Sequence, residues 1–310
     1  MKRGRVIGAL LAALAGTSAP AQDEEPPFRR LQVPGKDVCI SWAERTYTYT
    51  PDAAGSLPTP GDTEFAAIEA AYQTWQAASD SCSDFQFIRG ERQLDTVFGY
   101  DRAGLNNNIV VFRETACRSV VPVDDPCRDD GSCSNAYRCW DHGDFTIGLT
   151  VTSFTARDGT IVDADIGLNG SLHQDGQRFL FTTVGAPACV EGSESTTCVA
   201  TDVQNTLTHE LGHALGLDHV FVFGSTMEPT APVGETRKRI LDSGTLGGFC
   251  QIYQRGLPAA DCIQTGQIVP QVIAVNRGTP GLPNFACAAA GGGPWLAAAL
   301  ALLGILRRRR

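Results

Sequence analysis

The sequence predicts an α/β (α+β) fold in which a mostly parallel sheet packs against two long helices. Strand patterns over 38–49, 85–88 and 109–112 surround one long helical pattern, an order typical of a parallel sheet with a crossover helix. A second helical stretch, near residue 210, carries apolar residues four apart. With 310 residues and 43% hydrophobic content, the chain can bury one main core.

The first helix is expected to begin at an N-cap, Asp62, because prolines and Gly61 break the chain just before it. Its apolar residues recur at helical spacing and should pack on the sheet: Phe65, Ile68, Tyr72 and Trp75. Alternating residues over 146–155 and 159–169 predict two further strands.

The second helix is expected to open with a capping box made by Thr201 and Gln204. Its buried face is formed by residues four apart: Val203, Leu207, Leu211 and Leu215. A last short helix is expected over 246–253, tied by a disulfide between Cys250 and Cys262.

Residues 209–219 read HELGHALGLDH. His209 and His213 lie four apart, so a helix presents both imidazoles on one face, as zinc requires. Gly216 can end the helix and let the chain return His219 to the same ion. Three ligands leave one position for water, and Glu210 is placed to accept its proton as general base.

This motif, HExxHxxGxxH, together with Met227 in GSTMEP, resembles the metzincin clan of zinc endopeptidases, and the chain looks matrixin-like within it. The resemblance implies a zincin fold with a twisted five-stranded sheet, an antiparallel edge strand and a small C-terminal subdomain. It assigns that edge strand, which aligns the protein or peptide substrate, to 159–169. It also implies one catalytic Zn²⁺, Met227 as an apolar floor, and a pocket wall of Glu228, Pro229 and Thr230.

The alternative is a non-catalytic cell-surface protein that keeps zinc for binding or structure. Asp158, Asp163 and Asp165 could hold Ca²⁺, although solvated charges at strand ends are the simpler interpretation. His142 and His173 are expected to be surface histidines, because two histidines fall short of a second, structural zinc site.

Ten of the eleven cysteines fall in the body of the chain, which predicts five disulfides in an oxidising compartment. Four lie within 117–139, interpreted as a disulfide-stapled insertion, with a zinc ribbon as the alternative. Cys189 and Cys198 should form a local disulfide.

The two ends of the chain predict export. Residues 1–21 have the basic, apolar and small-residue regions of a signal peptide, and 22–35 is expected to be disordered. The catalytic domain is placed at 36–256 and a linker at 257–286. Residues 287–310 join Cys287, an apolar stretch and four arginines. They resemble a myxobacterial-type C-terminal sorting tag, with a permanent helical anchor as the alternative.

An extracellular or cell-surface location follows, with membrane contact only through the tag. The net charge of −9 argues against nucleic acid as a partner, and a monomer is expected.

Overall fold

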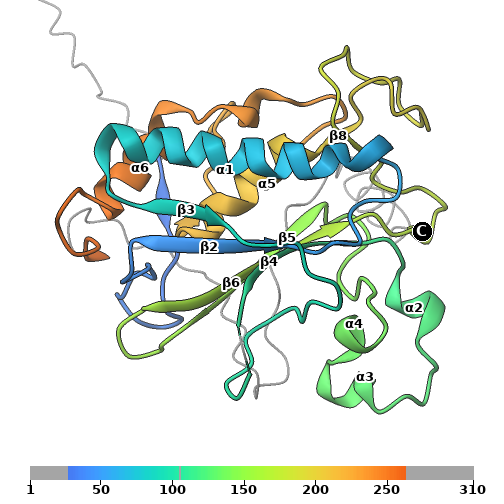
Figure 1. The fold of residues 1–310 in the computed structure, drawn as a ribbon, viewed down its shortest axis with the longest axis horizontal. Coiled ribbons are helices and arrows are strands. Elements are labelled where there is room, and N and C mark those ends of the chain that lie inside the picture. Colours follow the sequence, from blue (N-terminus) through green and yellow to red (C-terminus); the bar gives the residue numbers. More distant parts are fainter. Residues whose placement is uncertain (1–26, 105, 263–310) are drawn as a thin grey trace, which may run out of the picture.

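The computed structural model describes residues 27–104 and 106–262 (Figure 1). The strands are β1 (Arg29–Arg30), β2 (Thr46–Pro51), β3 (Gln86–Arg89), β4 (Asn108–Arg113), β5 (Gly148–Phe154), β6 (Ile161–Asn169), β7 (Phe181–Thr182), β8 (Thr201–Asp202) and β9 (Leu217–Asp218). The α-helices are α1 (Thr63–Cys82), α2 (Cys117–Val120), α3 (Cys127–Asp130), α4 (Cys133–Ala136), α5 (Val203–Ala214) and α6 (Ser243–Ile252). Two 3₁₀ turns, η1 (Pro60–Asp62) and η2 (Arg237–Arg239), complete the elements of this part.

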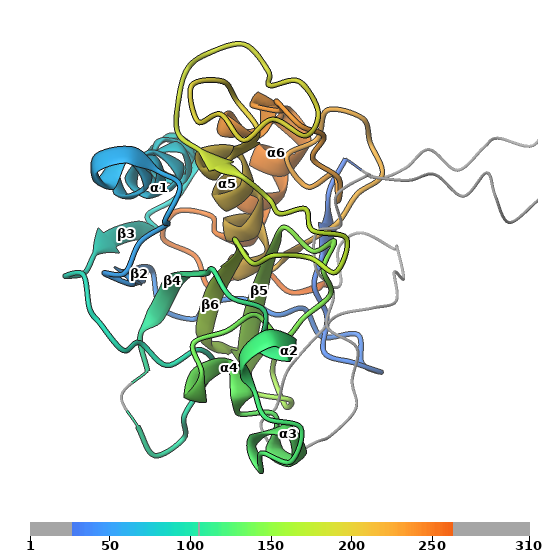
Figure 2. The same ribbon diagram turned by 90° about the vertical axis from the view of Figure 1, so that its right-hand side faces the viewer.

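The central sheet has five strands in the order β3-β2-β4-β6-β5. Neighbours are parallel except for β5, which runs antiparallel to β6. The α/β fold with a five-stranded sheet is therefore confirmed. Figure 2 shows α1, α5 and α6 together on one side of the sheet, with α2, α3 and α4 on the other.

The antiparallel edge strand is β5, so its assignment to 159–169 was wrong. That stretch contains β6, which lies inside the sheet between β4 and β5. Its side chains are buried almost without interruption, and such continuous burial is typical of an internal strand.

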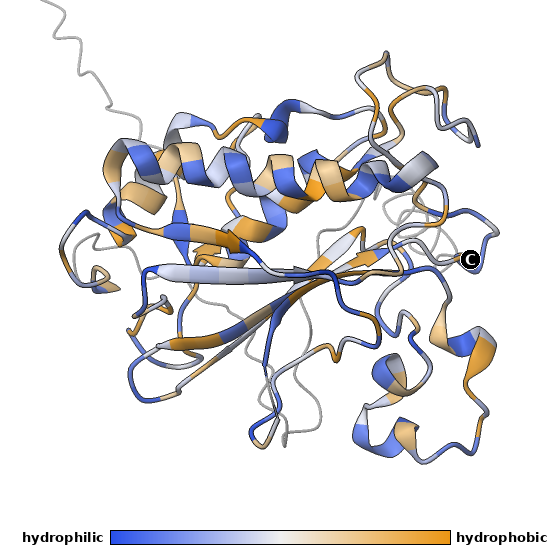
Figure 3. Cartoon of the chain, in the orientation of Figure 1, coloured by the Kyte–Doolittle hydropathy of each residue, from blue (hydrophilic) through white to orange (hydrophobic). Residues whose placement is uncertain are grey.

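The core lies between the sheet and the helices, and Figure 3 shows the apolar positions interleaved with polar ones along α1. The predicted apolar residues of α1 are all buried there: Phe65, Ile68, Tyr72 and Trp75. Trp75 also donates its indole N–H to the carbonyl of Thr208 at 3.0 Å, which ties α1 to α5. Asp62 precedes α1 but makes no side-chain cap and instead pairs with Arg92 at 2.9 Å.

Five disulfides are present, as predicted. Three of them are local: Cys117–Cys139, Cys127–Cys133 and Cys189–Cys198. The four cysteines of the insertion are therefore paired in disulfides and do not form a zinc ribbon. The predicted Cys250–Cys262 bond was wrong. Cys250 joins Cys82 of α1, and Cys262 joins Cys39, because each sulfur meets a partner far away in the sequence.

The ends of the domain extend beyond the predicted limits. The expected disorder of 22–35 was wrong for its described part, since β1 pairs antiparallel with β9 and both Leu31 and Val33 are buried. Residues 257–262, expected as linker, are held by the bond at Cys262. The predicted signal peptide, the sorting tag with Cys287 and the rest of the linker lie outside the described residues. Within the described part, none of the helices has the length and apolar character needed to cross a membrane.

Candidate metal centre

Helix α5 carries the first two histidines of the motif. It begins one residue later than predicted, because Asp202 rather than Thr201 is the N-cap, with Oδ1 accepting from the Asn205 backbone N–H at 2.7 Å. The predicted apolar face is fully buried: Val203, Leu207, Leu211 and Leu215. This packing fixes the side of α5 from which the histidines project.

A tight turn after α5 returns the chain toward the helix. Gly216 has φ +88°, a left-handed conformation that glycine adopts without steric cost. The last carbonyls of the helix are held by distant groups: Ala214 accepts from the Trp42 indole at 2.8 Å, and Leu215 from the Tyr253 hydroxyl at 2.9 Å. The predicted helix stop at Gly216 is confirmed, and it brings His219 back beside α5.

The three imidazoles converge through their Nε2 atoms. Nε2 of His213 lies 3.2 Å from that of His209 and 3.0 Å from that of His219, and the third separation is 3.2 Å. Within 27–104 and 106–262, these residues form the only group of three or more His, Cys, Asp or Glu side chains arranged to hold a metal ion.

Backbone carbonyls orient two of the rings. Nδ1 of His209 lies 2.6 Å from the Thr226 carbonyl, and Nδ1 of His213 lies 2.9 Å from the Leu217 carbonyl. A carbonyl only accepts, so each Nδ1 carries the proton and each Nε2 presents a lone pair to the centre. Lone pairs this close repel one another unless a cation lies between them.

The donor set fits a tetrahedral zinc ion. Zinc–nitrogen bonds of ~2.0–2.1 Å imply nitrogen atoms about 3.3–3.4 Å apart, only slightly wider than the spacing of the three Nε2 atoms. Burial, helped by Lys238 and the other two histidines, lowers the pKa of His209 well below its usual value. Burial, with His213 and Lys238, lowers the pKa of His219 to about 2. Neutral imidazole, the form that binds metal, is thus favoured at both positions.

Glu210 is held against the edge strand β5. It is 1% exposed, and its Oε2 accepts a hydrogen bond of 2.7 Å from the Thr150 hydroxyl. Oε1 is buried and has no hydrogen-bond partner among the described residues. A buried carboxylate oxygen left in this state is costly, about 1–3 kcal/mol or more, which suits a group that completes its bonding with a bound molecule.

Met227, expected from the resemblance to form an apolar floor beneath the metal, packs against α5. It is fully buried, and a Cβ atom placed on Gly212 would lie 2.2 Å from its sulfur. Glycine at 212 is therefore what allows the methionine to pack this close to the helix between the two histidines.

A family model described as Matrixin matches residues 138–254. The matched range is less than half of the chain, and it contains the three histidines, Glu210 and Met227. It supports the prediction of a matrixin-like metzincin and, in general, of a zinc-dependent metalloprotease. A search of curated proteins found no match to the chain.

The matrixin-like segment after Met227 is fixed by a buried lysine. Lys238 is 3% exposed, and its ammonium donates to the carbonyls of Glu228 at 2.6 Å and Thr230 at 2.8 Å. Glu228, Pro229 and Thr230, the predicted pocket wall, are half-buried and stand directly after the methionine. Sequence reasoning missed Lys238 because a lysine among arginines usually indicates a solvated surface.

The calcium candidates are not brought together into a metal-binding group in the described structure. Asp163 and Asp165 are buried, at 2% and 1% exposed, so their interpretation as solvated charges was wrong. Asp165 accepts from the backbone N–H groups of Ile109 and Gly99, and thereby joins β6 to the start of β4. Asp158 is bound locally by its neighbours Thr155 and Arg157.

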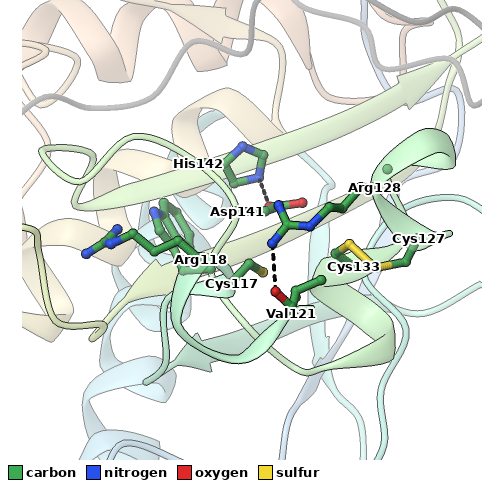
Figure 4. Close-up of a pocket in the computed structure, with 10 residues that line it drawn as sticks. Cys117, Arg118, Val121, Cys127, Arg128, Cys133, Asp141 and His142 are labelled. Atoms are coloured by element: carbon green, nitrogen blue, oxygen red, sulfur yellow. Dashed lines mark hydrogen bonds and ion pairs between the residues drawn. A yellow bond between two sulfur atoms is a disulfide. The ribbon is translucent and has the colours of Figure 1, made fainter. Parts of the chain in front are cut away.

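The two remaining histidines lie outside the triad. His173 is buried between the rings of Phe145 and Phe179, so the prediction of a surface position was wrong for it. His142 is partly buried beside Asp141 at 3.2 Å. It lines a pocket of 310 Å³ in the insertion, together with two arginines that Figure 4 shows among the cysteines. Neither histidine joins a metal-binding group in this part of the chain.

Proposed function

We propose that this protein is a zinc endopeptidase that hydrolyses internal peptide bonds of protein or peptide substrates. The ligands are His209, His213 and His219, and Glu210 is the general base. One observation carries the proposal: three Nε2 lone pairs meet within 3.2 Å, and the same helix holds a buried carboxylate, Glu210, with one oxygen that has no hydrogen-bond partner among the described residues. A zinc ion bound there supplies a Lewis acid that polarises the peptide carbonyl and lowers the pKa of bound water toward ~7.

The roles of the chain's own groups follow from their positions. Glu210 accepts a proton from the attacking water through Oε1 and passes it to the departing amine. In the described sheet, β5 is paired on one side only, with β6, so an extended substrate can align along its other edge by backbone hydrogen bonds. Glu228, Pro229 and Thr230 stand beside the side chain that follows the cleaved bond.

The substitution Glu210→Gln tests this proposal. Glutamine keeps the size of the side chain but cannot accept the proton, so zinc should stay bound at one ion per chain. Casein cleavage should fall by about 10²–10⁴-fold, the usual contribution of a general base. Glu69→Gln, on the exposed side of α1, is the matched control and should cleave casein normally. Undiminished cleavage by the Glu210→Gln protein would remove Glu210 from the mechanism.

Chelation separates the enzyme from the alternative, a protein that keeps zinc only for structure. Loss of casein cleavage with retained folding after chelator treatment, followed by recovery with added zinc, supports the enzyme. Unfolding on zinc removal, with no cleavage before it, supports the structural protein.

We further propose that the chain is exported and then displayed at the cell surface. The basis is the signal-peptide pattern of 1–21 and the tag pattern of 287–310. Amino-terminal sequencing of the protein from culture medium or cell envelopes should then start at Gln22. A chain that keeps Met1 would contradict export by this signal.

A further inference from the structure

The edge strand β5 presents small residues to helix α5. Gly148 and Thr150 both lie against the side chain of Glu210, and Thr152 follows on the same face of the strand. The intervening Leu149 and Val151 point the other way and pack with Trp140. One face of β5 therefore meets the proposed general base, while the other belongs to the core beneath the sheet.

We propose that Thr150 is a positioning residue for Glu210, an inference that rests on the proposed peptidase function. Its hydroxyl lies 2.7 Å from Oε2 and 2.9 Å from the backbone carbonyl of the same glutamate. The single hydroxyl proton has only acceptors within reach on Glu210, so Thr150 is the donor. A hydrogen bond to a carboxylate is shorter and stronger than one between neutral groups.

The hydrogen bond from Thr150 gives the two carboxylate oxygens of Glu210 different roles. Oε2 is occupied by Thr150, whereas Oε1 has no partner among the described residues and remains available for a water proton. Gly148 makes this arrangement possible, because a Cβ atom there would lie 2.7 Å from Oε1. A side chain at position 148 would push the carboxylate away from its place.

The hydrogen bond between Thr150 and Glu210 should affect the rate of the chemical step more than it affects substrate binding. The glutamate side chain has three rotatable torsions, and Thr150 is the hydrogen-bond donor that selects one arrangement of them. A small misplacement of a reacting group can reduce the rate about 10²-fold, whereas substrate is held mainly by other contacts. Loss of the bond should therefore lower kcat and leave KM and zinc content almost unchanged.

Thr152 offers a matched control. It is buried, at 2% exposed, and its hydroxyl has no hydrogen-bond partner within the described structure. Thr150→Val and Thr152→Val thus remove the same hydroxyl from the same strand, two residues apart, and only the first removes a bond to Glu210. Thr150→Ser keeps the donor and removes a methyl group.

The experiment compares the full-length wild type with these three variants. We expect Thr150→Val to lower kcat on labelled casein about 10–100-fold, the usual effect of losing a supporting partner, with KM within about twofold and one zinc per chain. Its Tm should fall by about 2–4 °C, because Oε2 loses its partner. Thr150→Ser should recover kcat to within about threefold, and Thr152→Val should keep the wild-type kcat with no loss of Tm, because it removes a buried hydroxyl that has no partner in the described structure.

Two results would overturn the inference while leaving the peptidase intact. One is a kcat of Thr150→Val within twofold of the wild type. The other is an equal loss in Thr152→Val, which would indicate general damage to the strand. If the zinc-loaded wild type itself does not cleave casein, the proposed function fails, and the role of Thr150 fails with it.

Discussion

Gly216 is where the backbone geometry of the metal centre can be tested most directly. Its φ of +88° is unfavourable for alanine by about 1–2 kcal/mol. A Cβ atom there would also lie 2.5 Å from the Ile40 carbonyl oxygen, well inside the 3.4 Å at which ordinary contacts begin. Relief of this contact costs about 1–3 kcal/mol more. We therefore expect Gly216→Ala to lower the free energy of unfolding by about 2–5 kcal/mol.

The same substitution should weaken zinc binding. The displaced backbone leads directly to His219, so the third Nε2 moves away from the other two, and we expect about a 10–100-fold loss of zinc affinity. Urea denaturation gives the first quantity, and competition with a chromogenic chelator gives the second. Gly176→Ala is the control: φ is +81° there, but within the described residues no atom beyond the chain neighbours lies within 4 Å of the new Cβ. Equal effects of the two substitutions would refute the reasoning.

Two further predictions concern the surroundings of the histidines. Lys238→Met should lower the free energy of unfolding by about 3–5 kcal/mol in urea denaturation. The reason is that the carbonyls of Glu228 and Thr230 lose a buried charged donor. A loss below about 1 kcal/mol would contradict this prediction. The pH dependence follows from His209 and His219, whose pKa values burial lowers below the unfolded value of about 6.5. The unfolded chain binds these protons first, so stability should fall as pH drops below about 6.5, approaching 2.7 kcal/mol per pH unit for the pair. Denaturation at a series of pH values checks this, and a flat profile from pH 7 to 5 would exclude it.

The convergence of the three histidines could be predicted from the sequence because its geometry is local. Eleven consecutive residues contain the helical spacing of His209 and His213, the glycine that turns the chain and the third ligand. The spacing of apolar residues likewise predicted the buried faces of α1 and α5.

What the sequence missed depends on partners far along the chain. The order of two neighbouring strands decides which one is the edge, and the resemblance to metzincins assigned the edge to the wrong strand of the two. The segment before Val33 has the composition of a disordered tail, yet β1 pairs with β9 almost two hundred residues later. Cys250 and Cys262 are near in sequence, but the fold carries each sulfur to another partner. No sequence pattern indicated Thr150, because its hydroxyl reaches Glu210 only when β5 is packed beside α5.

The histidines and the general base of the proposed site are held in place by different kinds of contact. The rings of His209 and His213 are oriented by main-chain carbonyls, which no single side-chain substitution deletes. Glu210 is held instead by one threonine side chain. Zinc binding should thus persist through most side-chain substitutions around these two rings, whereas a single substitution at position 150 should lower kcat about 10–100-fold. A chain that holds zinc but cuts slowly is therefore close in sequence to one that cuts at the full rate.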